Sequence, residues 1–336
     1  MQEQVSLRQY NSFGFDVKAK HFAEITCADE LVQLIESGIL KAEKHLIISG
    51  GNNILFCDDY FDGLVIHVNI KGFSAIGSGP HVTVTAAAGE DWPDFVKRTV
   101  EMGLYGLENL AHIPGKVGAA PVQNIGAYGA ELKDHFVCCE AIELTTGKRR
   151  TFSREECEFG YRSSIFKTHL KGEYLITNVT FLLSKEGTLN LEYSGIKKHL
   201  EQNGITKPAL SDLHDAICTI RDAKLPDVKK IGNAGSFFKN PIIGKEQFDA
   251  LLEIYPDMPH YAESDGNVKI PAGWLIEKAG WKGWRDEHVG VYEKQALVLV
   301  HYGGGKGCDI LALATRIFLS IEDKFGIEIS PEVNFV

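Results

Sequence analysis

The sequence lacks several features that would assign a protein to a class at once. It has no basic run longer than the three residues Lys148, Arg149 and Arg150, and its net charge is −10. A nucleic-acid surface normally shows a basic stripe, so the charge argues against that class. No run of about 18 apolar residues occurs, which argues against a membrane-spanning helix. The N-terminal residues contain no apolar signal-peptide core, and we therefore expect a cytoplasmic protein.

Paired cysteines and common catalytic motifs are also absent. The seven cysteines form no CxxC pair, a pattern that is typical of a reducing compartment without disulfides. The histidines show neither HExxH nor Cys/His spacing, so no metal site is expected. No GxGxxG, GxxxxGK[ST] or GxSxG motif occurs. A Rossmann dinucleotide site, a P-loop and a hydrolase nucleophile elbow are therefore unsupported.

The length and composition indicate a soluble globular protein of more than one domain. A chain of 336 residues is too long for one ordinary core, so two or three domains are expected. No repeat with a period of roughly 20 to 50 residues is present. An anionic small-molecule substrate remains compatible with the acidic chain, provided that a few lysines and arginines gather locally.

The most distinctive segment is residues 106–130, GLENLAHIPGKVGAAPVQNIGAYGA. It holds five glycines and two prolines, its only formal charges are Glu108 and Lys116, and it has neither helical nor strand periodicity. Small residues allow another body to approach the backbone N–H groups closely. The segment therefore favours a cofactor that carries phosphates, and the alternative is a tightly packed cluster of turns. His112 could in principle carry a covalent cofactor, but a packed or hydrogen-bonded histidine is favoured.

Periodicity and turn residues predict alternating helices and strands along the remainder of the chain. The N-terminal region is predicted to be irregular up to a helix that ends at Gly38, and residues 45–49 form a strand that runs into GGNN, a nest suited to an anion. Further strands are predicted at 64–69, 81–89, 173–183 and 295–303. Helices are predicted after Asp91, up to Gly204, after a cap at Ser211, and over 308–325. The apolar face of the last helix is expected to contain Leu311, Ala314, Ile317, Phe318 and Ile321.

Three further segments contain polar residues that indicate a site. FGYRSSIFK (159–167) places Arg162 among aromatic residues, where it either meets an anion or stacks on Tyr161 at the surface. KKIGNAGSFFKNP (229–241) is predicted to form a small polar turn that presents Ser236. An acidic residue near a chain end is most often solvated, but Glu332 lies inside the apolar C-terminal run, which raises the chance that it is held in a cleft.

Four segments in order make the chain resemble the UDP-N-acetylenolpyruvoylglucosamine reductase family. They are residues 106–132, FGYRSSIFK, NAGSFFKNP and the C-terminal PEV, supported by KLPD (224–227), AGWLIEKAG and QALVLV. The family reduces an enolpyruvyl nucleotide sugar to UDP-N-acetylmuramate with FAD and NADPH, in bacterial cell-wall (peptidoglycan) synthesis. The resemblance covers nearly the whole chain.

The resemblance implies an α+β fold with a two-part FAD-binding region of the vanillyl-alcohol-oxidase (PCMH) type and a separate α/β substrate-binding domain. It places one FAD-binding subdomain at 1–70, joined by the C-terminal strand 327–336. The second subdomain is placed at 71–221 and the substrate domain at 222–326. Family precedent implies a monomer.

The resemblance also implies which residues hold non-covalent FAD. They are Gly50, Gly51, Asn52, Asn53, Ile113, Pro114, Gly115, Gln123, Asn124 and Gly126. The family loop usually reads GGGSN or GEGSN, whereas this chain reads SGGNN. Asn52 replaces a serine, tolerates left-handed backbone and can still bond phosphate, so we expect FAD binding to survive.

By match to the family motifs, Arg162, Ser236 and Glu332 correspond to the catalytic trio. The resemblance implies that Arg162, with Glu332, stabilises the charge that builds on the substrate carboxylate after hydride transfer, and that Ser236 protonates the adjacent carbon. Tyr193, Lys224, Asn240 and Gln295 match positions that hold the substrate, and Tyr193 indicates the longer form of the family, with a tyrosine-bearing loop.

Two other interpretations remain open at this point. One keeps the FAD fold but makes the protein an oxidase or dehydrogenase of another small substrate. The other is a nucleotide-sugar-binding protein that has lost its flavin, for which the SGGNN loop is the only indication.

Overall fold

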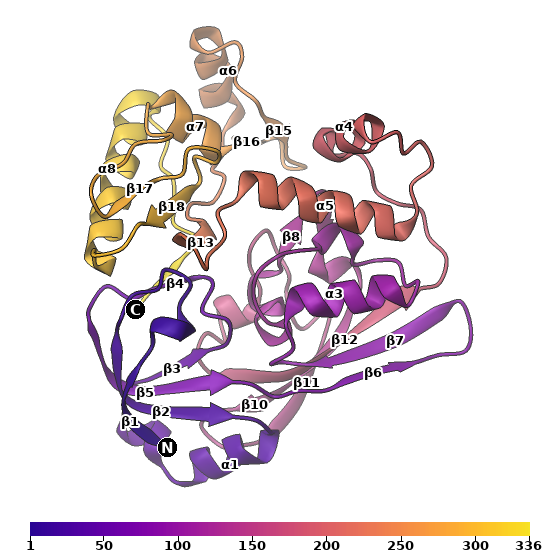
Figure 1. Cartoon of the computed structure of the whole chain (residues 1–336), viewed down its shortest axis with the longest axis vertical. Helices are drawn as coiled ribbons and strands as arrows, with labels where there is room; N and C mark the ends of the chain where they lie inside the picture. Colours follow the sequence, from indigo (N-terminus) through magenta and orange to yellow (C-terminus); the bar gives the residue numbers. More distant parts are fainter. The chain divides into compact units, whose positions relative to one another are not determined.

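The computed structural model describes the backbone of residues 1–336 and every side chain except that of Ser194. Its internal contacts divide the chain into two compact units, which Figure 1 shows coloured along the sequence. The first contains Met1–Val5, Ala19–Gly50 and Phe61–Ala223. The second contains Ser6–Lys18, Gly51–Tyr60 and Lys224–Val336. The division after Ala223 lies next to the expected boundary, but residues 51–60 group with the C-terminal part. The assignment of two FAD-binding subdomains stays a prediction.

A four-stranded sheet forms one part of the first unit. Its strand order is β1 (Gln2–Ser6), β2 (Lys18–Ile25), β5 (Tyr60–Val68) and β3 (His45–Ile48), with β3 and β5 parallel. The helices α1 (Ala28–Glu36) and α2 (Ile39–Ala42) supply Leu31, Ile35 and Leu40 to its core. Gly38 separates them with a φ of 81°, which confirms the predicted helix end. The prediction of irregular structure before α1 was wrong, because β1 pairs with β2 and β2 pairs with β5, a neighbour far along the sequence.

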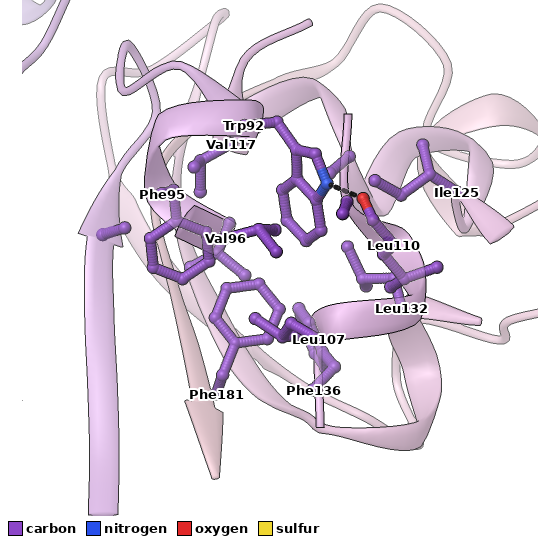
Figure 2. Close-up of a cluster of buried hydrophobic side chains, with 14 of the residues drawn as sticks. Trp92, Phe95, Val96, Leu107, Leu110, Val117, Ile125, Leu132, Phe136 and Phe181 are labelled. Atoms are coloured by element: carbon purple, nitrogen blue, oxygen red, sulfur yellow. Dashed lines mark hydrogen bonds between the residues drawn. The ribbon is translucent and has the colours of Figure 1, made fainter. Parts of the chain in front are cut away.

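A five-stranded antiparallel sheet forms the larger part of the first unit. Its order is β11 (Arg149–Ser153), β10 (Phe136–Glu143), β12 (Tyr174–Ser184), β7 (His81–Ala87) and β6 (Phe73–Ile76). The helix α3 (Trp92–Glu101) packs on this sheet through the aromatic cluster of Figure 2, in which the rings of Trp92, Phe95 and Phe181 contact one another. The indole Nε1 of Trp92 donates to the carbonyl of Leu110 at 2.9 Å. This bond joins α3 to the glycine-rich segment.

Short helices and turns complete the first unit. The 3₁₀ helices are η2 (Glu108–Leu110), η3 (Val117–Ala119), η4 (Pro121–Gln123), η5 (Leu132–Asp134) and η6 (Ile165–Lys167), and β8 (Gly126–Ala127) pairs with β9 (Ala130–Glu131). Of the longer helices, α4 spans Ser194–Gln202 and α5 spans Leu210–Lys224. The predicted cap at Ser211 was wrong, since α5 begins at Leu210 and the Asp212 carboxylate accepts the N–H of Ala209 at 2.7 Å.

The second unit contains three small sheets. They are the antiparallel β13 (Gly232–Ser236), β18 (Val298–His301) and β17 (Val289–Val291); the antiparallel β14 (Ile242–Ile243), β16 (Val268–Lys269) and β15 (Tyr261–Ala262); and the parallel pair β4 (Ile54–Leu55) and β19 (Asn334–Phe335). Its helices are η1 (Arg8–Tyr10), α6 (Lys245–Ile254), α7 (Ala272–Lys278) and α8 (Gly307–Phe325). The buried face of α8 contains the predicted Ala314, Ile317 and Ile321, but Ile310 and Leu313 replace Leu311 and Phe318 as fully buried members.

None of the described helices combines the length and the apolar composition that crossing a bilayer requires.

Candidate functional site

The loop Gly51–Asn53 in the second unit is fixed by the C-terminal residues. Asn53 donates from Nδ2 to the carbonyl oxygen of Glu332 at 3.2 Å, and its own carbonyl accepts the backbone N–H of Asn334 at 3.0 Å. The parallel pairing of β4 with β19 continues this contact, with Asn334 opposite Ile54. The predicted phosphate loop and the predicted acidic residue therefore lie side by side, although they are separated by 279 positions in sequence.

The same C-terminal segment holds the strand that carries Ser236. The N–H of Glu332 donates to the carbonyl of Phe237 at 2.8 Å, and the N–H of Lys239 donates to Ser330 at 2.9 Å. Glu332 thus bonds to the residue that follows Ser236 and to Asn53. Within the second unit, the structure brings together three of the segments that the sequence analysis selected.

Ser236 is presented by a bulge in β13. The register of β13 against β18 shifts between Asn233 and Ser236, and Gly235 has a φ of 69°. The side chain of Asn233 stabilises the bulge, accepting the N–H of Gly235 at 3.0 Å. A bulge of this kind redirects a side chain, and Ser236 is exposed although Phe237 is buried. The predicted polar turn was wrong, since the segment is a strand paired with β18.

The backbone of the loop fits a phosphate. The N–H groups of Gly51 and Asn52 donate to no backbone carbonyl within the part of the chain that the structure describes. Consecutive backbone N–H groups in a turn make a concave donor set for an anion. Gly51, with a φ of 61°, adopts the left-handed conformation, whereas Asn52 does not. The tolerance of asparagine for left-handed backbone is therefore not what this loop uses.

Gly51→Ala is expected to abolish FAD retention. A Cβ there would lie 1.9 Å from the carbonyl oxygen of Tyr10, in addition to the cost of a left-handed alanine, so the loop must move. The ratio of flavin to protein absorbance after purification measures the effect. Gly38→Ala is the matched control, because Gly38 has a φ of 81° and open space around it. Equal flavin content in Gly51→Ala and wild type would contradict the assignment of this loop.

Asn240 and Gln295 each lie near the beginning of α7. The Oδ1 atom of Asn240 accepts the N–H of Ala272 at 3.0 Å. Gly273 follows Ala272 in α7, and the Oε1 atom of Gln295 lies 3.3 Å from where a Cβ on Gly273 would be. Both side chains are half-buried and adjoin the same helical turn, while Lys224, the last residue of α5, is exposed.

In the first unit, the glycine-rich segment forms a cluster of turns against α3. Its backbone is held by bonds from Trp92 to the Gly115 carbonyl and from Gly118 to the Ala88 carbonyl, both 3.0 Å. Asp91 lies at the N-cap of α3, but its carboxylate pairs with Lys116 at 2.9 Å instead of capping the helix. Among the predicted cofactor residues of this segment, Pro114 is exposed, whereas the others are half-buried or, for Asn124, fully buried: Ile113, Gly115, Gln123, Asn124 and Gly126.

Arg162 lies on a turn with unusual backbone geometry. Its φ is 51°, a left-handed value that is rare for a residue with a long side chain. Its Nη2 donates to the carbonyl of Gly126 at 2.7 Å, and its guanidinium lies 5.8 Å from the centre of the Tyr161 ring. Arg162 is half-buried. Strained backbone of this kind is concentrated at functional sites.

Tyr193 lies beside two residues that the sequence analysis did not select. Its ring meets that of Tyr128 edge-on, with 4.9 Å between the ring centroids, and Tyr128 interacts electrostatically with Arg221. Burial lowers the pKa of Arg221, and its Nε donates to the carbonyl of His112 at 3.0 Å. His112 itself is hydrogen-bonded to Asp222, as expected for a histidine with a structural role. Two sequence features could have identified these residues. Tyr128 is an aromatic residue in the glycine-rich segment, and Arg221 lies three positions before Lys224.

Comparison with known proteins gives consistent matches. A family model described as FAD binding domain matches residues 19–153, and one described as UDP-N-acetylenolpyruvoylglucosamine reductase, C-terminal domain, matches residues 226–336. The chain is 45% identical to the UDP-N-acetylenolpyruvoylglucosamine reductase of Flavobacterium johnsoniae, over 100% of this chain and 99% of that protein. It is 46% identical to the enzyme of the same name from Pseudomonas syringae pv. tomato, over 99% and 98%.

A solved structure supports the fold. The crystal structure of UDP-N-acetylenolpyruvylglucosamine reductase from Thermus caldophilus superposes with a TM-score of 0.70 at 22% identity, over 98% of this chain and 97% of that one. Together with the two family models, this confirms the expected α+β class with an FAD-binding region and a separate C-terminal domain.

Proposed function

Because the chain belongs to the UDP-N-acetylenolpyruvoylglucosamine reductase family, we propose that it uses NADPH to reduce the enolpyruvyl double bond of UDP-N-acetylglucosamine enolpyruvate. The product is UDP-N-acetylmuramate, for peptidoglycan precursor synthesis. One observation carries the proposal: the backbone of Glu332 bonds both to Asn53 of the phosphate loop and to Phe237, the neighbour of Ser236. No observation favours an oxidase of another substrate.

The donor set of the loop and the glycine-rich segment fits FAD. The N–H groups of Gly51 and Asn52 would hold its phosphates, and the segment around Ile113 to Gly115 and Gln123 to Gly126 would line the remainder. When bound, the flavin would take a hydride from NADPH and, in its reduced form, would supply it to the terminal vinyl carbon of the substrate. Ser236, Arg162 and Glu332 are proposed to act on the substrate.

Ser236 is the proposed general acid. It would give its hydroxyl proton to the carbon next to the substrate carboxylate, and solvent would restore that proton. A hydroxyl is a weak acid, so transfer requires close approach to the developing carbanion. The bulge in β13 provides this access, because it leaves Ser236 exposed at the end of a paired strand.

Arg162 is the proposed electrostatic group. Negative charge develops on the substrate carboxylate as hydride arrives, and a fixed guanidinium stabilises it without reorganisation. The bond to Gly126 and the left-handed backbone fix the arginine before substrate binds. Glu332 is proposed to share the task. Tyr193, Lys224, Asn240 and Gln295 are proposed to hold the diphosphate, sugar or carboxylate.

A visible spectrum tests the function directly. The absorption spectrum of the purified protein is recorded under anaerobic conditions, first alone, then after addition of NADPH, and then after addition of the enolpyruvyl nucleotide sugar. We expect flavin bands that bleach with NADPH and return on addition of that substrate. Bands that stay bleached would overturn the substrate assignment. A protein without flavin bands, even after added FAD, would overturn the cofactor assignment.

Ser236→Ala is expected to lower kcat by about 10²- to 10⁴-fold, the usual contribution of a general acid. Flavin content and the rate of flavin reduction by NADPH should stay at wild-type values, because neither step needs this proton. Ser236→Cys, which restores a donor at the same place, should recover part of the loss. A kcat for Ser236→Ala within about twofold of wild type would remove Ser236 from the mechanism.

A further inference from the structure

The turn that carries Arg162 is tied to residues 122–126 at three points. The Nδ2 atom of Asn124 donates to the carbonyl of Gly160 at 3.0 Å, and the Oγ atom of Ser164 donates to the carbonyl of Val122 at 2.6 Å. The third tie is the bond from Arg162 itself to Gly126. Gly160 and Ser163 close the turn by bonding to each other in both directions, at 3.0 and 3.2 Å.

Asn124 makes one of these three ties and also bonds elsewhere through the same side chain. It is 0% exposed and has a φ of 43°, and its amide makes contacts with two further segments. Besides Gly160, its Nδ2 donates to the Glu131 carboxylate at 3.2 Å, and its Oδ1 accepts the N–H of Lys133 at 3.1 Å. A side chain that is fully buried and satisfied inside the protein offers no surface to a cofactor.

Asn124 is connected both to the residue that accepts the Arg162 bond and to the turn that carries Arg162. It lies two residues before Gly126, which accepts the guanidinium bond, and its amide holds Gly160, two residues before Arg162. A shift of Asn124 therefore moves the acceptor and the turn together. An arginine keeps a left-handed backbone conformation only where its surroundings hold the backbone in place. For Arg162, these hydrogen bonds hold it.

We propose that Asn124 is a positioning residue that sets the guanidinium of Arg162 for the charge on the substrate carboxylate. This inference rests on the proposed function. It assigns the Asn124 side chain a positioning role in place of the contact with FAD that the family resemblance implied. It concerns only the half-reaction in which Arg162 acts. Displacement of a catalytic group by about 1 Å lowers rates by as much as about 100-fold, so a small change in the turn is measurable.

Stopped-flow measurement of Asn124→Asp tests the proposal. The variant keeps the size and the Oδ1 acceptor, but it puts an acceptor where Nδ2 donates to Gly160 and Glu131. Reoxidation of the flavin by the enolpyruvyl substrate should slow by about 10- to 100-fold, while flavin reduction by NADPH keeps the wild-type rate. Ser164→Ala, which removes the second tie, should slow the same half-reaction. If Asn124→Asp does not fold, Asn124→Gly, which accepts left-handed backbone, replaces it with the same expectations.

A double-mutant cycle separates positioning from a general loss of structure. In the Arg162→Ala background, Asn124→Asp should cause no further loss, because the residue through which it acts is gone. Asn178→Asp is the matched control: it makes the same change at a donor to a carboxylate, Glu140, away from the turn. It should leave both half-reactions unchanged.

The outcomes are distinct. A wild-type protein whose reduced flavin the substrate does not reoxidise overturns the proposed function and this inference together. Wild-type reoxidation with an unchanged rate in Asn124→Asp overturns the inference alone. Equal further losses from Asn124→Asp with and without Arg162, or equal slowing of both half-reactions, also overturn it.

Discussion

Replacing Arg162 by alanine is expected to lower kcat by about 10²- to 10³-fold while the protein keeps its flavin. This is the usual cost of removing one preorganised group that stabilises charge in the transition state. The loss should appear in kcat and in kcat/KM alike, because the contact strengthens as charge develops. Flavin reduction by NADPH should stay at the wild-type rate. Steady-state kinetics and the flavin spectrum of the same preparation provide the measurements.

Arg162→Lys is the control for charge alone. Lysine keeps the positive charge but loses the planar fork, which bonds to the Gly126 carbonyl and is proposed to reach the substrate as well, so it should recover only part of the rate. If Arg162→Ala loses flavin but keeps its rate per bound cofactor, Arg162 supports the cofactor site and not the reaction.

Trp92→Ala is expected to reduce the free energy of unfolding by about 3–5 kcal/mol, the range found when a buried aromatic side chain is truncated. Trp92 is 1% exposed, and it joins Phe95 and Phe181 across α3 and the five-stranded sheet (Figure 2). The change also removes the donor to the Leu110 carbonyl, so the glycine-rich segment should loosen. Urea unfolding of the flavin-free protein, followed by circular dichroism, measures the loss.

Trp92→Phe separates packing from the hydrogen bond. It retains an aromatic ring but leaves the Leu110 carbonyl without this donor, and should cost about 1–3 kcal/mol. Flavin affinity should fall as stability falls, so that Trp92→Ala binds flavin more weakly than Trp92→Phe. An unfolding midpoint for Trp92→Ala equal to that of wild type would contradict the central role of this cluster.

The features that sequence predicted correctly are those that local chemistry determines. Gly38 and Gly204 were expected to end helices, and they have φ values of 81° and 71°. A left-handed residue after a helix is a local requirement that glycine meets at little cost. At the start of α5, by contrast, Ser211 and Asp212 are both capping residue types, and the sequence alone does not choose between them.

The features that sequence missed depend on distant partners. The segment around Ala234 contains small polar residues typical of a turn, and it becomes a strand only because β18 pairs with it. The burial of Asn124 depends on Gly160 and Lys133, which no local pattern connects to it. The family resemblance selected candidate residues, while the contacts among Asn53, Glu332 and Phe237 required coordinates.

The pairing of β4 with β19 sets an order of events during synthesis. The ribosome makes Asn53 279 residues before Glu332, which corresponds to roughly 15 to 55 s at typical translation rates. During that interval the loop at Gly51 has no partner strand, so a nascent chain cannot assemble the loop in its final form. The proposed capture of the cofactor through this loop would therefore be a late, post-translational event. Loss of only the last few residues to a protease would resemble loss of the loop itself.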